Sequence, residues 1–230
     1  MTAIANPDDA LITQETVTAY RDLRRGIGLL GLTLPWVLII GHHGFRESIS
    51  GFYYTNMRNW FVGSMCVTGV FLIFYRYQKA GLDNVLSSVA GVCAILVALC
   101  PTTGTNPTSA EQVVGVLHLC FAACFLGLLA YFCLFLFTKT NPNLPRTPRK
   151  NIRNRIYTGC GISIIVGLAF AVLCQIPALH SFRDSANGVY WGESLAVVAF
   201  GIAWLIKGET LFRDPPASSS GPLQAGAVAP

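Results

Sequence analysis

Charged residues are scarce in this sequence: Asp, Glu, Lys and Arg make up 12% of its 230 residues, whereas an average soluble domain has about 25%. Apolar residues make up 53%, and the mean hydropathy is +0.52. One soluble core cannot bury so much apolar surface in a chain of this length, so the composition indicates a membrane protein. The formal net charge of +5 does not indicate nucleic-acid binding, because the basic residues form short clusters between apolar runs.

Several common motifs are also missing. The eight Cys residues include no CxxC pair and all fall within or beside apolar runs, which favours packing over zinc or redox chemistry. No HExxH, HxxxH or GxSxG pattern occurs, so neither a helical zinc-protease motif nor a serine-hydrolase elbow is present. The N-terminus lacks a basic region that leads directly into an apolar run, so we expect the first apolar run to remain as an anchor.

What the sequence does contain is a series of long apolar segments. They predict an all-α, polytopic transmembrane helix bundle of about six spans, at residues 26–41, 60–76, 84–100, 113–138, 156–177 and 190–207. Five spans remain an alternative, because several segments are near the lower limit of roughly 20 residues needed to cross a bilayer. These segments divide the chain into three parts. Residues 1–25 are expected to be a cytoplasmic N-terminal segment, residues 26–208 the transmembrane helix bundle, and residues 209–230 a disordered cytoplasmic tail.

The distribution of Lys and Arg predicts the orientation. Thirteen of the sixteen fall on one set of alternate connecting segments and three on the other. The positive-inside rule then places both termini in the cytoplasm, and loops one, three and five outside a cytoplasmic (inner) membrane. Residues 139–155 (KTNPNLPRTPRKNIRNR) are expected to form a cytoplasmic loop that contacts anionic lipid head groups. Membrane lipids are therefore the expected partners, further membrane-protein subunits are left open, and no nucleic acid is expected.

Loop one, from His42 to Trp60 (HHGFRESISGFYYTNMRNW), has unusually many ionisable and polar side chains for a connection between spans. It carries two His, two Arg, one Glu and two Tyr, and loops three and five on the same side add further polar groups such as Glu111. Ionisable residues within spans are costly and commonly functional. We therefore predict a lipid-binding or sensing pocket on the outer side, with ligand-binding residues Glu47, Tyr54, Arg58, His118, Arg183 and Glu193.

Structural interpretations of the same residues remain open. His118 could bridge two helices through a hydrogen bond, and Arg58 could be an anchor that reaches the membrane surface. The aromatic residues of these loops are expected to form an interfacial belt, a prediction that covers Tyr53, Tyr54, Trp60, Tyr190 and Trp191.

Three functions follow from this pattern. The leading hypothesis is a binding, sensing or structural membrane component that is not an enzyme and needs no cofactor. The second is a membrane-embedded, metal-dependent hydrolase of a lipid-like substrate, with a zinc ion held by His118 and Glu193; catalytic residues are then unknown. The third is an accessory subunit of a larger membrane complex.

Three stretches also carry a resemblance: ESISGFYYTNMRNWFVG, VFLIFYR followed by DN, and WGESLAVVAFGIAWLIKG. They resemble stretches of uncharacterised bacterial multi-pass inner-membrane proteins and, more distantly, of six-span proteins of the Frag1/DRAM type. The resemblance implies a multi-pass inner-membrane protein over most of residues 26–208, and a link with lipid handling. It assigns no chemistry to any residue.

Overall fold

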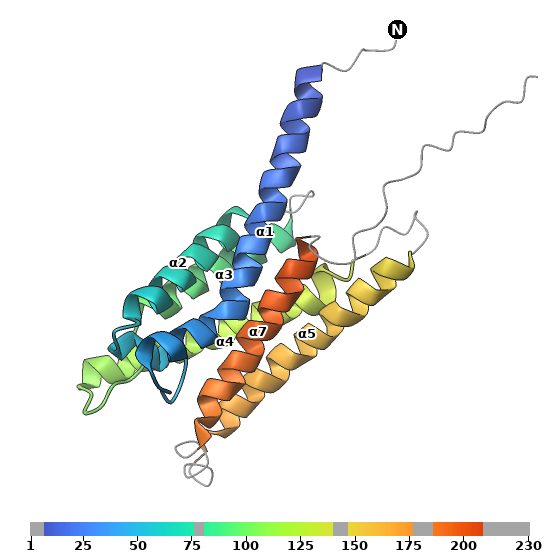
Figure 1. Cartoon of the computed structure of the whole chain (residues 1–230). Helices are drawn as coiled ribbons and strands as arrows, with labels where there is room; N and C mark the ends of the chain where they lie inside the picture. Colours follow the sequence, from blue (N-terminus) through green and yellow to red (C-terminus); the bar gives the residue numbers. More distant parts are fainter. Residues whose placement is uncertain (1–6, 76–80, 140–146, 177–185, 209–230) are drawn as a thin grey trace, which may run out of the picture.

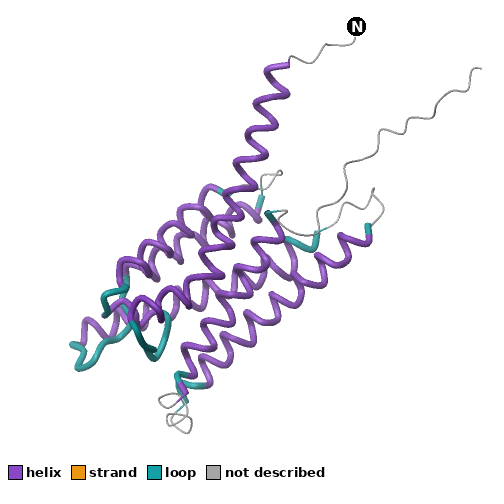
Figure 2. Tube along the Cα trace, viewed as in Figure 1, coloured by secondary structure: helices purple, strands orange, loops and turns teal. Residues whose placement is uncertain are grey.

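The structure is a computed structural model that describes residues 7–75, 81–139, 147–176 and 186–208. Within these ranges the chain is helical apart from short connections, and no strand occurs among them (Figure 2). The helices are α1 (Pro7–His42), α2 (Arg58–Phe74), α3 (Leu82–Leu99), α4 (Ser109–Tyr131), α5 (Pro148–Leu173) and α7 (Gly188–Lys207). A 3-10 turn, η1 (Ser50–Tyr54), lies in loop one, and a π-helical turn, η2 (Phe132–Leu136), prolongs α4. The predicted all-α helix bundle is confirmed.

In the described ranges, six α-helices form the bundle. They run in alternating directions (Figure 1). Five of them, α1, α3, α4, α5 and α7, are long and apolar enough to cross a membrane. The sixth, α2, has 17 residues and lies alongside α3 (Figure 1). The alternation brings the end of α7 back to the end of the bundle from which α1 projects (Figure 1).

Two boundaries differ from the prediction. α1 begins at Pro7, not near residue 26, and extends well beyond the bundle (Figure 1). Residues 8–25 contain no Gly or Pro that would end a helix, and an Asp22–Arg25 ion pair of 3.0 Å spans one turn within them. Apolar residues mark only the part of a helix that meets lipid, so the hydropathy pattern missed this polar extension.

The second difference concerns residues 139–155, which are predicted to form a loop. In the structure α5 begins at Pro148, so the last part of this segment forms the first two turns of α5. The Thr147 side chain accepts a hydrogen bond from the Lys150 backbone N–H at 3.1 Å, and Pro148 occupies the first helical position. Both are common features of a helix start. The tail after residue 208 lies outside the described residues.

Close helix crossings fix the core of the bundle. A Cβ atom on Gly91 of α3 would lie 2.4 Å from the carbonyl oxygen of Gly69 on α2. The α5–α7 crossing is equally close, because a Cβ on Gly167 would lie 2.4 Å from the Gly192 carbonyl oxygen. In lipid, where apolar side chains gain little by leaving the solvent, such close approach of small residues supplies much of the helix association energy.

Candidate functional site

Loop one folds onto the beginning of α7. The Tyr190 backbone N–H donates to the Glu47 carbonyl oxygen at 3.0 Å. The Ile49 backbone N–H donates to the Glu193 carboxyl group at 2.7 Å, so an acidic side chain of α7 holds the loop backbone. These two contacts make loop one a folded cap over the end of the bundle.

The ring of Tyr190 is part of the same anchor. It is fully buried, and its hydroxyl donates to the Pro35 carbonyl oxygen of α1 at 2.8 Å. Its centroid lies 5.6 Å from that of Phe45 and 6.2 Å from that of Phe52, both in loop one. The predicted place of Tyr190 in an interfacial belt is therefore wrong, because its ring is enclosed by α1 and loop one.

Tyr190→Phe is expected to lower the free energy of unfolding by about 1 kcal/mol, the usual net contribution of one hydrogen bond. The thermal midpoint in detergent, monitored by size-exclusion chromatography, measures this loss of stability. Tyr131→Phe is the matched control. It removes the same hydroxyl from a half-buried ring at the last residue of α4, away from loop one. An equal shift in both variants would contradict a specific role for the Tyr190 hydroxyl.

A pocket of about 380 Å³ opens between loop one and loop three (residues 101–108); we call it the loop pocket. Loop one contributes Arg46, Glu47 and Tyr54, and the other wall is formed by Thr103, Gly104, Thr105, Asn106, Pro107 and Glu111. The loop pocket thus combines one guanidinium, two carboxylates and several hydroxyl and amide groups.

Tyr54 joins the two walls of the loop pocket. Its hydroxyl donates to the Thr102 carbonyl oxygen at 2.6 Å, and a Cβ on Gly104 would come within 3.3 Å of its ring. Burial raises the pKa of Tyr54, and the nearby Tyr53 and Glu111 add to the effect. Tyr54 therefore remains a neutral hydrogen-bond donor at physiological pH.

The far wall is fixed by the start of α4. The Glu111 carboxylate accepts a hydrogen bond from the Thr108 backbone N–H at 2.7 Å, and the Thr108 hydroxyl accepts one from the Glu111 N–H at 3.3 Å. This reciprocal capping box is readable in the sequence as TSAE. It is the signal that could have located the loop-three wall, whose small residues the sequence prediction did not select.

The predicted ligand-binding residues fall in different places. Glu47 and Tyr54 line the loop pocket together. The Arg58 guanidinium lies over the Tyr53 ring, 4.1 Å from its centroid, and donates to the Tyr53 hydroxyl. Arg58 is not among the residues that line the loop pocket. Arg183 lies outside the described residues.

The two ionisable residues within the spans, His118 and Glu193, both form hydrogen bonds with backbone groups of other segments. His118 is 2% exposed, and its Nδ1 lies 2.7 Å from the Cys100 carbonyl oxygen at the end of α3, which fits the helix-bridging interpretation. Glu193 lines a small cavity of about 50 Å³ under loop one, together with Ser50 and apolar side chains. In the described part of the chain, no group of three or more His, Cys, Asp or Glu residues is placed to hold a metal ion.

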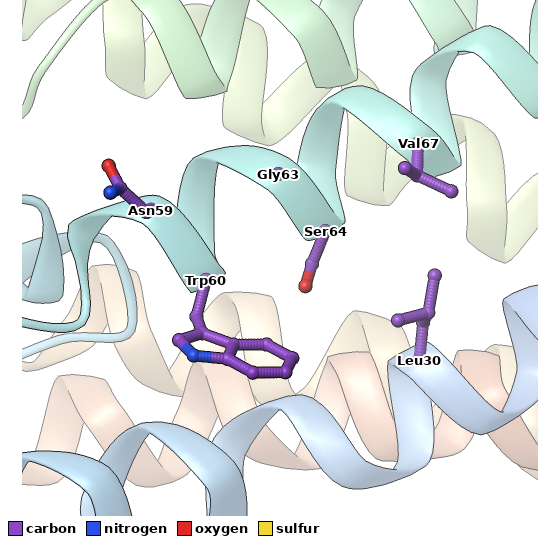
Figure 3. Close-up of a pocket in the computed structure, with 6 residues that line it drawn as sticks. All are labelled: Leu30, Asn59, Trp60, Gly63, Ser64 and Val67. Atoms are coloured by element: carbon purple, nitrogen blue, oxygen red, sulfur yellow. The ribbon is translucent and has the colours of Figure 1, made fainter.

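A different hollow lies on the side of the bundle, between α1 and α2 (Figure 3). It measures about 330 Å³ and is lined by Leu30, Asn59, Trp60, Gly63, Ser64 and Val67. The Trp60 indole lies in the gap between the two helices, and the Ser64 side chain points toward α1 (Figure 3). Trp60 is 59% exposed, so this crevice opens onto the apolar flank of the bundle and lacks the charges of the loop pocket.

Comparison of the chain with protein-family models, with curated proteins and with solved structures finds no match. The resemblance to bacterial multi-pass proteins and to the Frag1/DRAM type stays a prediction. The chemistry of the loop pocket is therefore the basis for a functional assignment.

Proposed function

We propose that this integral membrane protein is a binding component that takes the polar head group of an amphiphile in the loop pocket, without catalysing a reaction. The observation that carries the proposal is that one guanidinium, of Arg46, and two carboxylates, of Glu47 and Glu111, line one hollow. Its volume of about 380 Å³ falls within the roughly 300–1,000 Å³ typical of small-molecule sites.

The charges favour a zwitterionic ligand that carries an ammonium and a phosphate. A guanidinium binds phosphate oxygens in a bidentate manner, and carboxylates bind ammonium groups. Arg46 now pairs with Glu47 at 3.3 Å, with side-chain exposures of 35% and 58%. An exposed pair of this kind contributes about 0–1 kcal/mol, so a ligand can replace it at little cost.

The frame of the loop pocket supports binding because it is held before a ligand arrives. Glu193 and Tyr190 anchor the first half of loop one to α7. The second half is fixed by the His42 ring, whose Nδ1 lies 2.8 Å from the Asn56 side-chain oxygen. A preformed site avoids the entropy loss of ordering a loop on binding.

Orientation and location belong to the proposal. The positive-inside rule applied to the basic clusters places the loop pocket on the outer side of a cytoplasmic membrane, with both termini inside. There the loop pocket would meet head groups of the outer leaflet, in agreement with a lipid-binding role.

The test is binding of glycerophosphoethanolamine, a soluble zwitterionic head group, to the full-length protein in detergent by isothermal titration calorimetry. Arg46→Gln is expected to weaken binding at least tenfold, since a hydrogen bond to a charged group contributes about 1.5–3 kcal/mol. Arg58→Gln is the matched control, because it removes the same charge from the same loop outside the loop pocket. The proposal fails if the probe does not bind, or if both variants weaken binding equally.

A further inference from the structure

The end of the bundle opposite the loop pocket gathers basic side chains from two helices, α1 and α7; we call it the basic end. α1 contributes Arg24 and Arg25, and α7 contributes Lys207. Two carboxylates lie nearby, and each already has a cation: Asp22 pairs with Arg25 at 3.0 Å and Asp83 with Lys139 at 2.5 Å. The basic end therefore attracts anions.

Two of these cations flank a buried aromatic cluster. Trp204 is fully buried, with its centroid 5.4 Å from that of Tyr75 and 4.9 Å from that of Phe137. The Arg24 guanidinium lies over the Tyr75 ring at 5.1 Å, and the Lys207 ammonium lies over the Phe137 ring at 5.1 Å. α1 and α7 meet directly here, because a Cβ on Gly208 would lie 3.1 Å from the Arg25 side chain.

A second, independent observation is that buried donors at the basic end lack acceptors. Arg24 Nε, Arg25 Nε and Trp204 Nε1 are buried with no hydrogen-bond partner in the described part of the chain. Buried donors normally have a partner, and a buried donor without one destabilises the fold. All three are N–H donors, so an acceptor-only group such as a phosphate suits them.

We propose that the basic end holds the phosphate of an anionic membrane lipid, bound by Arg24, Arg25 and Lys207, with the Trp204 N–H as the innermost donor. A lipid is the favoured source because Lys207 is the last residue of a candidate membrane span, at the depth of a head group. Basic groups between spans are a known means of holding anionic head groups. This site does not depend on the function proposed for the loop pocket.

Native mass spectrometry of the purified full-length protein tests the site. We expect one tightly bound phosphatidylglycerol, and weaker binding of phosphatidylcholine, which has a phosphate but no net charge. Arg24→Gln and Lys207→Gln should each weaken phosphatidylglycerol binding about tenfold or more, and Trp204→Phe should weaken it while preserving an aromatic ring. Arg24→Lys checks that a loss does not come from misfolding, because it keeps the charge.

The matched control is Arg155→Gln, an exposed cation on α5. An equal loss in this control would overturn the site, because it would indicate diffuse attraction to a basic surface. Equal binding of the two lipids would also overturn it. A separate titration with inorganic phosphate distinguishes the source: saturation by phosphate without any preference for phosphatidylglycerol would overturn the assignment to a lipid.

Discussion

Gly91→Leu is expected to prevent formation of the native bundle. A Cβ at this position would lie 2.4 Å from the Gly69 carbonyl oxygen and 2.8 Å from the Ile73 backbone nitrogen, both on α2. Overpacking a core costs about 1–3 kcal/mol when side chains can yield, and here the obstacle is backbone. α2 must therefore move away from α3, which removes the packing that holds α2, the shortest of the six helices. Fluorescence-detected size-exclusion chromatography should show loss of the native peak.

The control for this prediction is Gly63→Leu on α2. A Cβ on Gly63 has no atom within 4 Å, because this residue borders the open crevice between α1 and α2 (Figure 3). The same added side chain should therefore leave the native peak and thermal midpoint nearly unchanged. If Gly91→Leu behaved like Gly63→Leu, the close α2–α3 crossing would be refuted.

The contrast between these two glycines shows what the sequence could and could not predict. Six apolar segments predict six helices, because hydropathy reports contact with lipid. The sequence also suggests that small residues lie at helix contacts, but it does not give the direction in which each points. Gly63 and Gly91 both lie in apolar runs, and only the packed bundle separates an open position from a closed one.

The same limit explains the partial prediction of the site. Position along the chain places Glu47, Tyr54 and Arg58 in one loop, but η1 directs Tyr54 toward Thr102 while Arg58 turns onto Tyr53. For His118, the sequence gives a depth within α4, and its partner is a backbone carbonyl at the end of another helix. Backbone carbonyls have no sequence signature, so such pairings could not be predicted from residue types.

Glu193→Leu is expected to release loop one while leaving the bundle assembled. The variant removes the acceptor of the Ile49 N–H, and the Glu193 carboxylate also interacts with the Ser50 backbone N–H. Each buried amide left without an acceptor costs about 1–3 kcal/mol. The cost falls on loop one, and the helix contacts of α7 remain, so the change is local.

Two opposing effects limit the global consequence. Leu relieves the cost of keeping a carboxylate at the edge of a 50 Å³ apolar cavity, while the amides of loop one lose their partner. The thermal midpoint should therefore change little. Hydrogen exchange of the loop-one amides should instead rise roughly 5- to 150-fold, which corresponds to about 1–3 kcal/mol.

Glu193→Gln separates the charge of Glu193 from its role as acceptor. The amide oxygen of Gln can still accept from the Ile49 N–H, so exchange should stay near the wild-type rate. Hydrogen exchange measured by mass spectrometry on peptides from residues 45–54 compares the three proteins. Unchanged exchange in Glu193→Leu would show that Tyr190 and its aromatic contacts suffice to hold loop one. Fast exchange in both variants would show that the negative charge itself is required, because Gln retains the geometry and loses only the charge.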